Sequence, residues 1–167
     1  MKTCAIIGNR YNVPCENIQY LEDVGYYLGQ IGYTLNSGGA LGCDQAGERG
    51  FDRGGFPKVI RRANDATPEA MAIASNFHDA WHVCSPYVRQ LHGRNSMIIL
   101  GDDLDSPVDF VLCHASSEIK GGTALGIKIA RDNKIPVFNL FKKNHGFDEF
   151  LKGLVNEVRQ TEEARKS

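Results

Sequence analysis

Ser37-Gly38-Gly39-Ala40-Leu41-Gly42-Cys43-Asp44 is the stretch of sequence that decides the fold. It follows a short apolar segment, Tyr33 to Asn36, and leads into a helical pattern that reaches about Gly50. Glycine permits a tight turn and lets the backbone approach a ligand closely. The first amides of the helix that follows have no partner within the helix, so they are free to bind an anion such as phosphate. The stretch therefore predicts a strand, a glycine turn and a helix whose first turn faces a ligand.

The same succession of a short apolar segment and a longer helical pattern repeats along the chain. We predict further strands at Thr3 to Ile7, Lys58 to Arg61, Val108 to Cys113 and Ile135 to Leu140. Helices are expected at Ile18 to Ile31, Pro68 to about Asn76, Pro86 to Ile98, Ala124 to about Asn133 and Phe147 to Val158. Strands that alternate with helices are typical of a parallel sheet crossed by helices.

Length and composition are those of one soluble domain. The chain has 167 residues, of which 42% are hydrophobic and 23% charged, and a domain typically takes about 100–200 residues. We predict a single α/β domain over residues 1–160, built on a parallel sheet of five or more strands flanked by helices, and a frayed polar tail over residues 161–167. No apolar run approaches the roughly 18 residues of a membrane span, and the apolar N-terminal stretch is too short for a signal peptide. We therefore expect a cytosolic protein without a membrane partner.

Charge and cysteine content limit the class of partner. The net charge is −1, from 19 basic and 20 acidic residues, so attraction to nucleic acid has to come from a local patch. The five cysteines are scattered and contain no C-x-x-C pair, which predicts reduced thiols rather than disulfides or a zinc ribbon. One modest basic patch is expected around the second helix and third strand, unless these residues are only an exposed charged edge: Arg49, Arg53, Lys58, Arg61 and Arg62.

Three of the predicted strands end in glycine-bearing turns, which are Gly8-Asn9-Arg10, Ser37-Gly38-Gly39 and Gly121-Gly122-Thr123. The carboxyl ends of parallel strands lie along one edge of the sheet, where ligands of such folds bind. We therefore predict that these residues bind the phosphate of a nucleotide around a common hollow in which Ser37, Gly122 and Arg10 meet. The alternative is that the glycines only permit tight turns.

Charged and polar side chains near these turns are further candidates. Arg10 is either a phosphate ligand or an exposed surface arginine. Asp44 lies in the first turn of its helix, where it either complements the helix dipole or accepts hydrogen bonds from ribose hydroxyls. Arg94 and Asn95 lie on a helix with a buried face; Arg94 is the better ligand candidate, whereas Asn95 either contacts the ligand or ties loops together. If the chain is an enzyme, Asp44 and Arg94 are the candidate catalytic residues.

Other patterns argue against a cofactor or a metal ion. The acidic residue that a nicotinamide-binding fold requires about 20 positions after the glycines is absent, and so is the G-x-x-x-x-G-K-[ST] loop of P-loop NTPases. His78, His82 and Cys84 have a spacing that a metal ion can use, but no second pair of ligands is nearby, so we expect no metal. Trp81 is expected to pack in the core, with a stacking platform for a base as the alternative.

The segment from Ser37 to Asp44 resembles the S-G-G-A-x-G-x-D segment of the DprA/Smf DNA-processing proteins and their relatives in the SLOG superfamily. Arg94-Asn95 resembles the R-N pair that follows it in those proteins. A group of small phage and bacterial DprA-like proteins is more similar still, and the resemblance covers nearly the whole chain. The elements shared with this group are H-x-R-N, G-G-T and I-P-V-F-N-L, here His92 to Asn95, Gly121 to Thr123 and Ile135 to Leu140.

The resemblance implies a Rossmann-like sheet that holds a nucleotide or a nucleic-acid phosphate at its strand ends, and it implies a homo-oligomer. DprA relatives bind single-stranded DNA and load a recombinase, so it implies a nucleotide- or single-stranded-DNA-binding protein in phage or bacterial DNA processing. Another branch, the LOG enzymes, cleaves the N-glycosidic bond of nucleoside monophosphates. Their glutamate is missing after Gly121-Gly122-Thr123 here, and Glu118 lies before the turn. An N-glycosidase is therefore one alternative, and a sensor or sponge for an ADP-ribose-like nucleotide is another.

Overall fold

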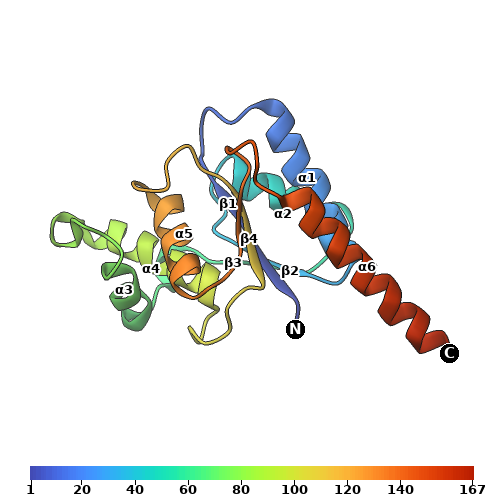
Figure 1. The fold of residues 1–167 in the computed structure, drawn as a ribbon. Helices are drawn as coiled ribbons and strands as arrows, with labels where there is room; N and C mark the ends of the chain where they lie inside the picture. Colours follow the sequence, from blue (N-terminus) through green and yellow to red (C-terminus); the bar gives the residue numbers. More distant parts are fainter.

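The chain forms a five-stranded sheet with helices on both faces, as the computed structural model of residues 1–167 shows (Figure 1). All strand pairs are parallel, in the order β3-β2-β1-β4-β5, which confirms the predicted α/β fold. The strands are β1 (Thr3–Gly8), β2 (Thr34–Ser37), β3 (Lys58–Ile60), β4 (Phe110–His114) and β5 (Val137–Asn139). The helices are α1 (Cys15–Gln30), α2 (Cys43–Arg53), α3 (Pro68–Ser75), α4 (Pro86–Leu100), α5 (Gly122–Asp132) and α6 (Phe147–Lys166). Two short 3-10 turns lie at Ala63–Asp65 and Trp81–Val83.

The two faces of the sheet bury alternate residues of the same strands, because successive side chains of a strand point in opposite directions. Cys4 and Ile6 of β1 pack in the core beneath α1, α2 and α6. Ala5 and Ile7 pack in the opposite core, beneath α4 and α5. Figure 1 shows these two groups of helices on either side of the strands. Because both faces of β1 and β4 are covered, their sequences are continuous apolar runs rather than alternating ones.

The order of the strands determines where a ligand can bind. β2 and β3 lie on one side of β1 in the sheet, whereas β4 and β5, which come later in the chain, lie on its other side. β1 and β4 are paired along their length, up to Gly8 beside His114. The connections that follow these two strands lead to opposite faces of the sheet, and in folds of this type they leave a crevice between them.

The helices differ from the predicted ones at their ends. α2 continues past Gly50 to Arg53, and α6 continues to Lys166, so residues 161–166 are helical rather than frayed. The prediction gave too much weight to the polarity of this tail. Glutamate, glutamine, lysine and arginine are good helix formers, and basic residues in the last turn of α6 complement the helix dipole. None of the helices combines the length and apolar character needed to cross a membrane.

Candidate functional site

A cavity of about 320 Å³ lies at the carboxyl edge of the sheet, where the predicted glycine turns converge. The turn after β1, the start of α2, the middle of α4 and the first turn of α5 form its wall. The β2 turn faces the cavity through Ala40, and the first turn of α2 through Asp44. The predicted residues that line it are Gly8, Asn9, Arg10, Asp44, Arg94, Asn95, Gly122 and Thr123. Those outside the lining are Ser37, Gly38, Gly39 and Gly121.

The turns after β1 and β2 pack directly on each other at Gly42. This residue has a φ of +82°, and a Cβ atom there would lie 2.7 Å from the carbonyl oxygen of Asn9 and 2.9 Å from that of Arg10. Glycine therefore allows the two backbones to meet. Asn9 also connects the turn after β1 to the loop after β4, because its Oδ1 accepts a hydrogen bond from the amide of Ser116 at 2.9 Å. Arg10 is exposed at the cavity, where its guanidinium is accessible to a ligand.

Ser37, which we expected at the hollow, is fully buried beneath the turn and does not reach the cavity. Its hydroxyl donates a hydrogen bond to Oε2 of Glu48 at 2.9 Å and accepts one from the amide of Gly39 at 3.4 Å. Glu48 is itself buried on α2. The serine therefore stabilises a buried carboxylate and ties the β2 turn to α2, and the hollow forms without it.

Gly38 is held from both sides by charged groups of the cavity wall. Nη1 of Arg94 donates to the carbonyl oxygen of Gly38 at 2.7 Å, while the Gly38 amide donates to Oδ2 of Asp44 at 3.2 Å. Arg94 also donates to the carbonyl oxygen of Arg61 at 3.3 Å. A Cβ atom at position 38 would lie 2.9 Å from the guanidinium and 3.0 Å from the carboxylate. The glycine turn therefore shapes the cavity from behind, by leaving room for both charges.

Asp44 and Arg94 bring two buried charges to the cavity, with exposed fractions of 5% and 9%. Burial raises the pKa of Asp44 to about 7, although Arg94 and the Gly38 amide act in the opposite direction. Burial also lowers the pKa of Arg94, against the influence of Asp44, but an arginine stays protonated in proteins. The cavity thus contains a carboxyl group that changes its charge near neutral pH beside a permanent cation.

The first turn of α5 presents backbone amides to the cavity. Its N-cap is Gly121, which has a φ of +105° and offers no side-chain cap, so these amides remain available. Gly122 and Thr123 of this turn line the cavity. Asn95 holds the turn in place, because its Nδ2 donates to the carbonyl oxygen of Gly122 at 3.3 Å while its Oδ1 accepts from Nε of Arg94 at 2.9 Å. An uncapped helix N-terminus carries partial positive charge and favours an anion.

One face of α4 forms an apolar wall that we did not predict as part of the site. Val88, Leu91, Ile98 and Ile99 line the cavity from this face, which also carries Asn95. The sequence predicts a buried face for this helix but does not place that face at the cavity. Residues three and four positions apart share one face of a helix, so the apolar residues at these spacings from Asn95 were the signal for the wall.

Glu118 has a structural role. Its carboxylate accepts hydrogen bonds from Nζ of Lys142 at 2.8 Å and Nδ2 of Asn139 at 3.0 Å, and it pairs with Arg131. Burial raises its pKa, but these three partners outweigh burial and lower the pKa to about 2. The group therefore stays ionised and holds the loop before α5 against β5.

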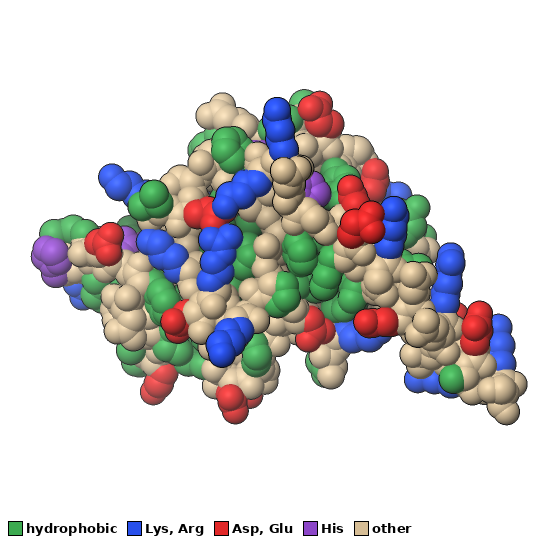
Figure 2. Space-filling model, viewed as in Figure 1, with side chains coloured by type: hydrophobic (Ala, Val, Ile, Leu, Met, Phe, Trp, Pro, Cys, Tyr) green, Lys and Arg blue, Asp and Glu red, His purple; other side chains and the backbone are tan.

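The basic patch expected around α2 and β3 is largely neutralised by acidic neighbours. Figure 2 presents the face with α5 and α6, where acidic and basic side chains are mixed along α6. The ion pairs are Arg49 with Glu22, Arg53 with Asp23, Lys58 with Asp52 and Arg61 with Asp102. An exposed charged edge, the alternative considered from the sequence, describes these residues better than a binding stripe.

Comparison with known proteins identifies the fold. No protein-family model matches the chain, and no curated protein matches it. The structure is similar to that of DNA processing protein A from Helicobacter pylori, with a TM-score of 0.56 and 17% sequence identity, over 98% of this chain and 81% of that one. That protein was described for its mode of binding single-stranded DNA. The expected DprA-like fold is therefore confirmed.

Proposed function

We propose that the cavity binds one nucleotide unit, either free or as part of a single-stranded nucleic acid. The observation that carries this proposal is that one cavity joins a helix N-terminus, two arginines and an apolar wall. The helix N-terminus and the arginines suit a phosphate, and the apolar wall suits a base. The DprA-like fold supports the same class of ligand, since the similar protein was described for binding single-stranded DNA.

The proposed ligand is divided among the elements of the wall. The phosphate lies at the amides of Gly122 and Thr123, with Arg10 on the open side, and the base packs on the α4 face that contains Leu91. Asp44 faces the sugar. A volume of about 320 Å³ is near the lower end of the roughly 300–1,000 Å³ range of ligand sites, which favours a single nucleotide over a dinucleotide.

Calorimetry with three ligands tests this proposal. Adenosine monophosphate, ADP-ribose and a short oligothymidylate are titrated into the protein at low and moderate salt. The proposal expects binding of at least one ligand at low salt. A steep loss of affinity with salt identifies the oligonucleotide as the ligand, because its binding releases many counterions, whereas tight and salt-tolerant binding of ADP-ribose identifies a sensor or sponge. The absence of binding by all three at low salt overturns it.

A nucleotide N-glycosidase is the second candidate, because Asp44 has a strongly perturbed pKa and lines the cavity. Carboxyl groups with a pKa near neutrality are common at catalytic sites, where they exchange protons with the substrate. This candidate predicts that free base is released from a nucleoside monophosphate and that Asp44→Asn stops the release. The N-glycosidase function is excluded if chromatography detects no free base from purine or pyrimidine substrates.

We predict that the affinity for oligothymidylate rises on acidification from about pH 8 to about pH 6. Asp44 is negative above its pKa of about 7 and neutral below it, so protonation removes a charge that repels phosphate. A phosphodiester keeps its own charge over this range. The expected gain is about tenfold, on the order of 1.4 kcal/mol, as measured by fluorescence anisotropy.

Asp44→Asn is the matched variant for this pH dependence. It should bind at about pH 8 as tightly as the wild type binds at about pH 6, with no pH dependence of its own in this range. A wild-type affinity that falls on acidification contradicts the prediction, since it indicates that the carboxylate accepts a hydrogen bond from the ligand.

A further inference from the structure

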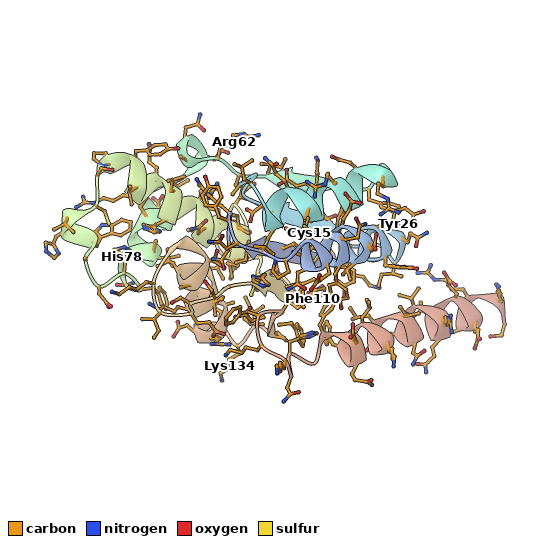
Figure 3. The ribbon with its side chains drawn as sticks, turned by 90° about the horizontal axis from the view of Figure 1, so that it is seen from above. Cys15, Tyr26, Arg62, His78, Phe110 and Lys134 are labelled. Atoms are coloured by element: carbon orange, nitrogen blue, oxygen red, sulfur yellow. The ribbon has the colours of Figure 1, made fainter.

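Three potential metal ligands, His78, Cys84 and His92, meet beside the cavity. Their ligating atoms all lie within 4.8 Å of one another. His78 and Cys84 come from the connection between α3 and α4, and Figure 3 shows His78 at the side of the molecule opposite the end of α6. His92 comes from α4 and also lines the cavity.

The distance between the Cys84 sulfur and the His78 ring is close to that found in a tetrahedral zinc site. Zinc binds a thiolate sulfur at about 2.3 Å and an imidazole nitrogen at about 2.0–2.1 Å, so sulfur and nitrogen ligands of one ion lie about 3.6 Å apart. Sγ of Cys84 lies 3.7 Å from Nε2 of His78 and 4.0 Å from its Nδ1. A thiolate with two imidazoles is a donor set that zinc prefers, and a fourth position remains for water.

His92 provides a second, independent observation. It is 9% exposed, and its Nδ1 is buried without a hydrogen-bond partner. A buried polar atom that lacks a partner costs stability. A metal ion is a partner that this ring otherwise lacks.

The segment that carries Cys84 is fixed against α4. The guanidinium of Arg89 donates to the carbonyl oxygen of Trp81 at 3.1 and 3.3 Å and lies 5.6 Å from the centre of the Trp81 ring. Trp81 packs against the core, as expected, and its ring centre lies 6.2 Å from that of His78 and 6.1 Å from that of His92. The ligands are therefore held together before any ion binds.

We propose that His78, Cys84 and His92 bind one zinc ion, with water as the fourth ligand. Binding releases the thiol proton of Cys84 to solvent and competes with the amide of Ala80, which donates to Nδ1 of His78 at 3.1 Å. The affinity is therefore lower than that of a four-ligand structural site. The proposal is independent of the nucleotide function, although His92 brings the ion close to the cavity.

The sequence does not reveal this cluster, because its ligands come from two separate segments. His82 has a suitable spacing from His78 and Cys84, but it is exposed and does not belong to the cluster. The third ligand, His92, lies on the next helix. Only the packing of the α3–α4 connection against α4 brings it to the other two.

Cobalt and zinc titrations of the full chain, after removal of metal with a chelator, test the proposal. We expect one ion per chain, the absorption bands of tetrahedral cobalt and a thiolate-to-cobalt charge-transfer band, all displaced by zinc. Cys84→Ser should abolish the charge-transfer band. Cys84→Ser and His78→Gln should each weaken zinc binding by at least about tenfold. The matched controls are Cys15→Ser and His82→Gln, which change exposed residues outside the cluster and should bind like the wild type.

Circular dichroism establishes whether each variant is folded. If Cys84→Ser does not fold, the zinc affinity of His78→Gln decides the outcome. Two results overturn the proposal. One is cobalt binding below one ion per chain or without a charge-transfer band. The other is a folded cluster variant that binds zinc as tightly as the wild type.

Discussion

Arg94→Met is expected to weaken ligand binding in the cavity strongly and to destabilise the protein. The side chain donates to the carbonyl oxygens of Gly38 and Arg61 and counterbalances Asp44. Hydrogen bonds to charged groups contribute about 1.5–3 kcal/mol each, and a buried acceptor that loses its donor costs about 1–3 kcal/mol. We expect the affinity for the phosphate ligand to fall at least about 30-fold and the free energy of unfolding to fall by roughly 3 kcal/mol.

Calorimetry and urea unfolding measure the two effects of Arg94→Met separately. Arg159→Met is the matched control, because Arg159 is exposed on α6, and it should change neither quantity. Arg94→Lys should restore part of the affinity, since it keeps the charge but not the paired geometry of the guanidinium. Ligand affinity within threefold of the wild type in folded Arg94→Met would contradict the assignment of this residue to the site.

Gly50→Ala is expected to have the largest effect on stability alone. A Cβ atom at this position would lie 2.1 Å from the carbonyl oxygen of Glu22 and 2.8 Å from the amide nitrogen of Tyr26. Both atoms belong to the backbone of α1, so the clash is relieved only if the two helices separate. Overpacking costs typically 1–3 kcal/mol and occasionally more, which exceeds the gain of about 1 kcal/mol from the higher helix propensity of alanine. We expect a net loss of about 2 kcal/mol.

Gly153→Ala is the control for Gly50→Ala, because it makes the same substitution in helix α6 where a Cβ atom meets no neighbour. It should stabilise the protein by roughly 0.5–1 kcal/mol. Urea unfolding followed by circular dichroism compares the two variants. If Gly50→Ala is as stable as the wild type, α1 and α2 do not pack as closely as described.

The sequence predicts the strands and turns well because their signals are local. Apolar runs such as Thr3 to Ile7 end at a glycine, and the end of each run marks the end of a strand. The order of the strands was not predicted, since the pairing of β1 with β4 joins segments about a hundred residues apart. Helix ends were predicted less well, because good helix formers extend α6 through its polar tail.

The site was predicted in part for a similar reason. Glycine turns at strand ends locate the edge of the sheet, so Arg10, Gly122 and their neighbours were found. Ser37 was misplaced because the sequence does not reveal which side of the turn is buried, and in the structure its hydroxyl faces Glu48. The apolar wall could not be predicted from the sequence, because it depends on how α4 packs against the sheet and α5. The expected self-association and cytosolic location remain predictions.

Helix α4 gives the cavity a rigid wall. Its side chains from Val88 to Ile99 are carried by one continuous helix, which begins at a serine cap and is packed in the core at its far end. We expect such a wall to keep its shape when the proposed nucleotide binds. We then expect association in a single step, whose rate follows ligand concentration and diffusion without a slow rearrangement.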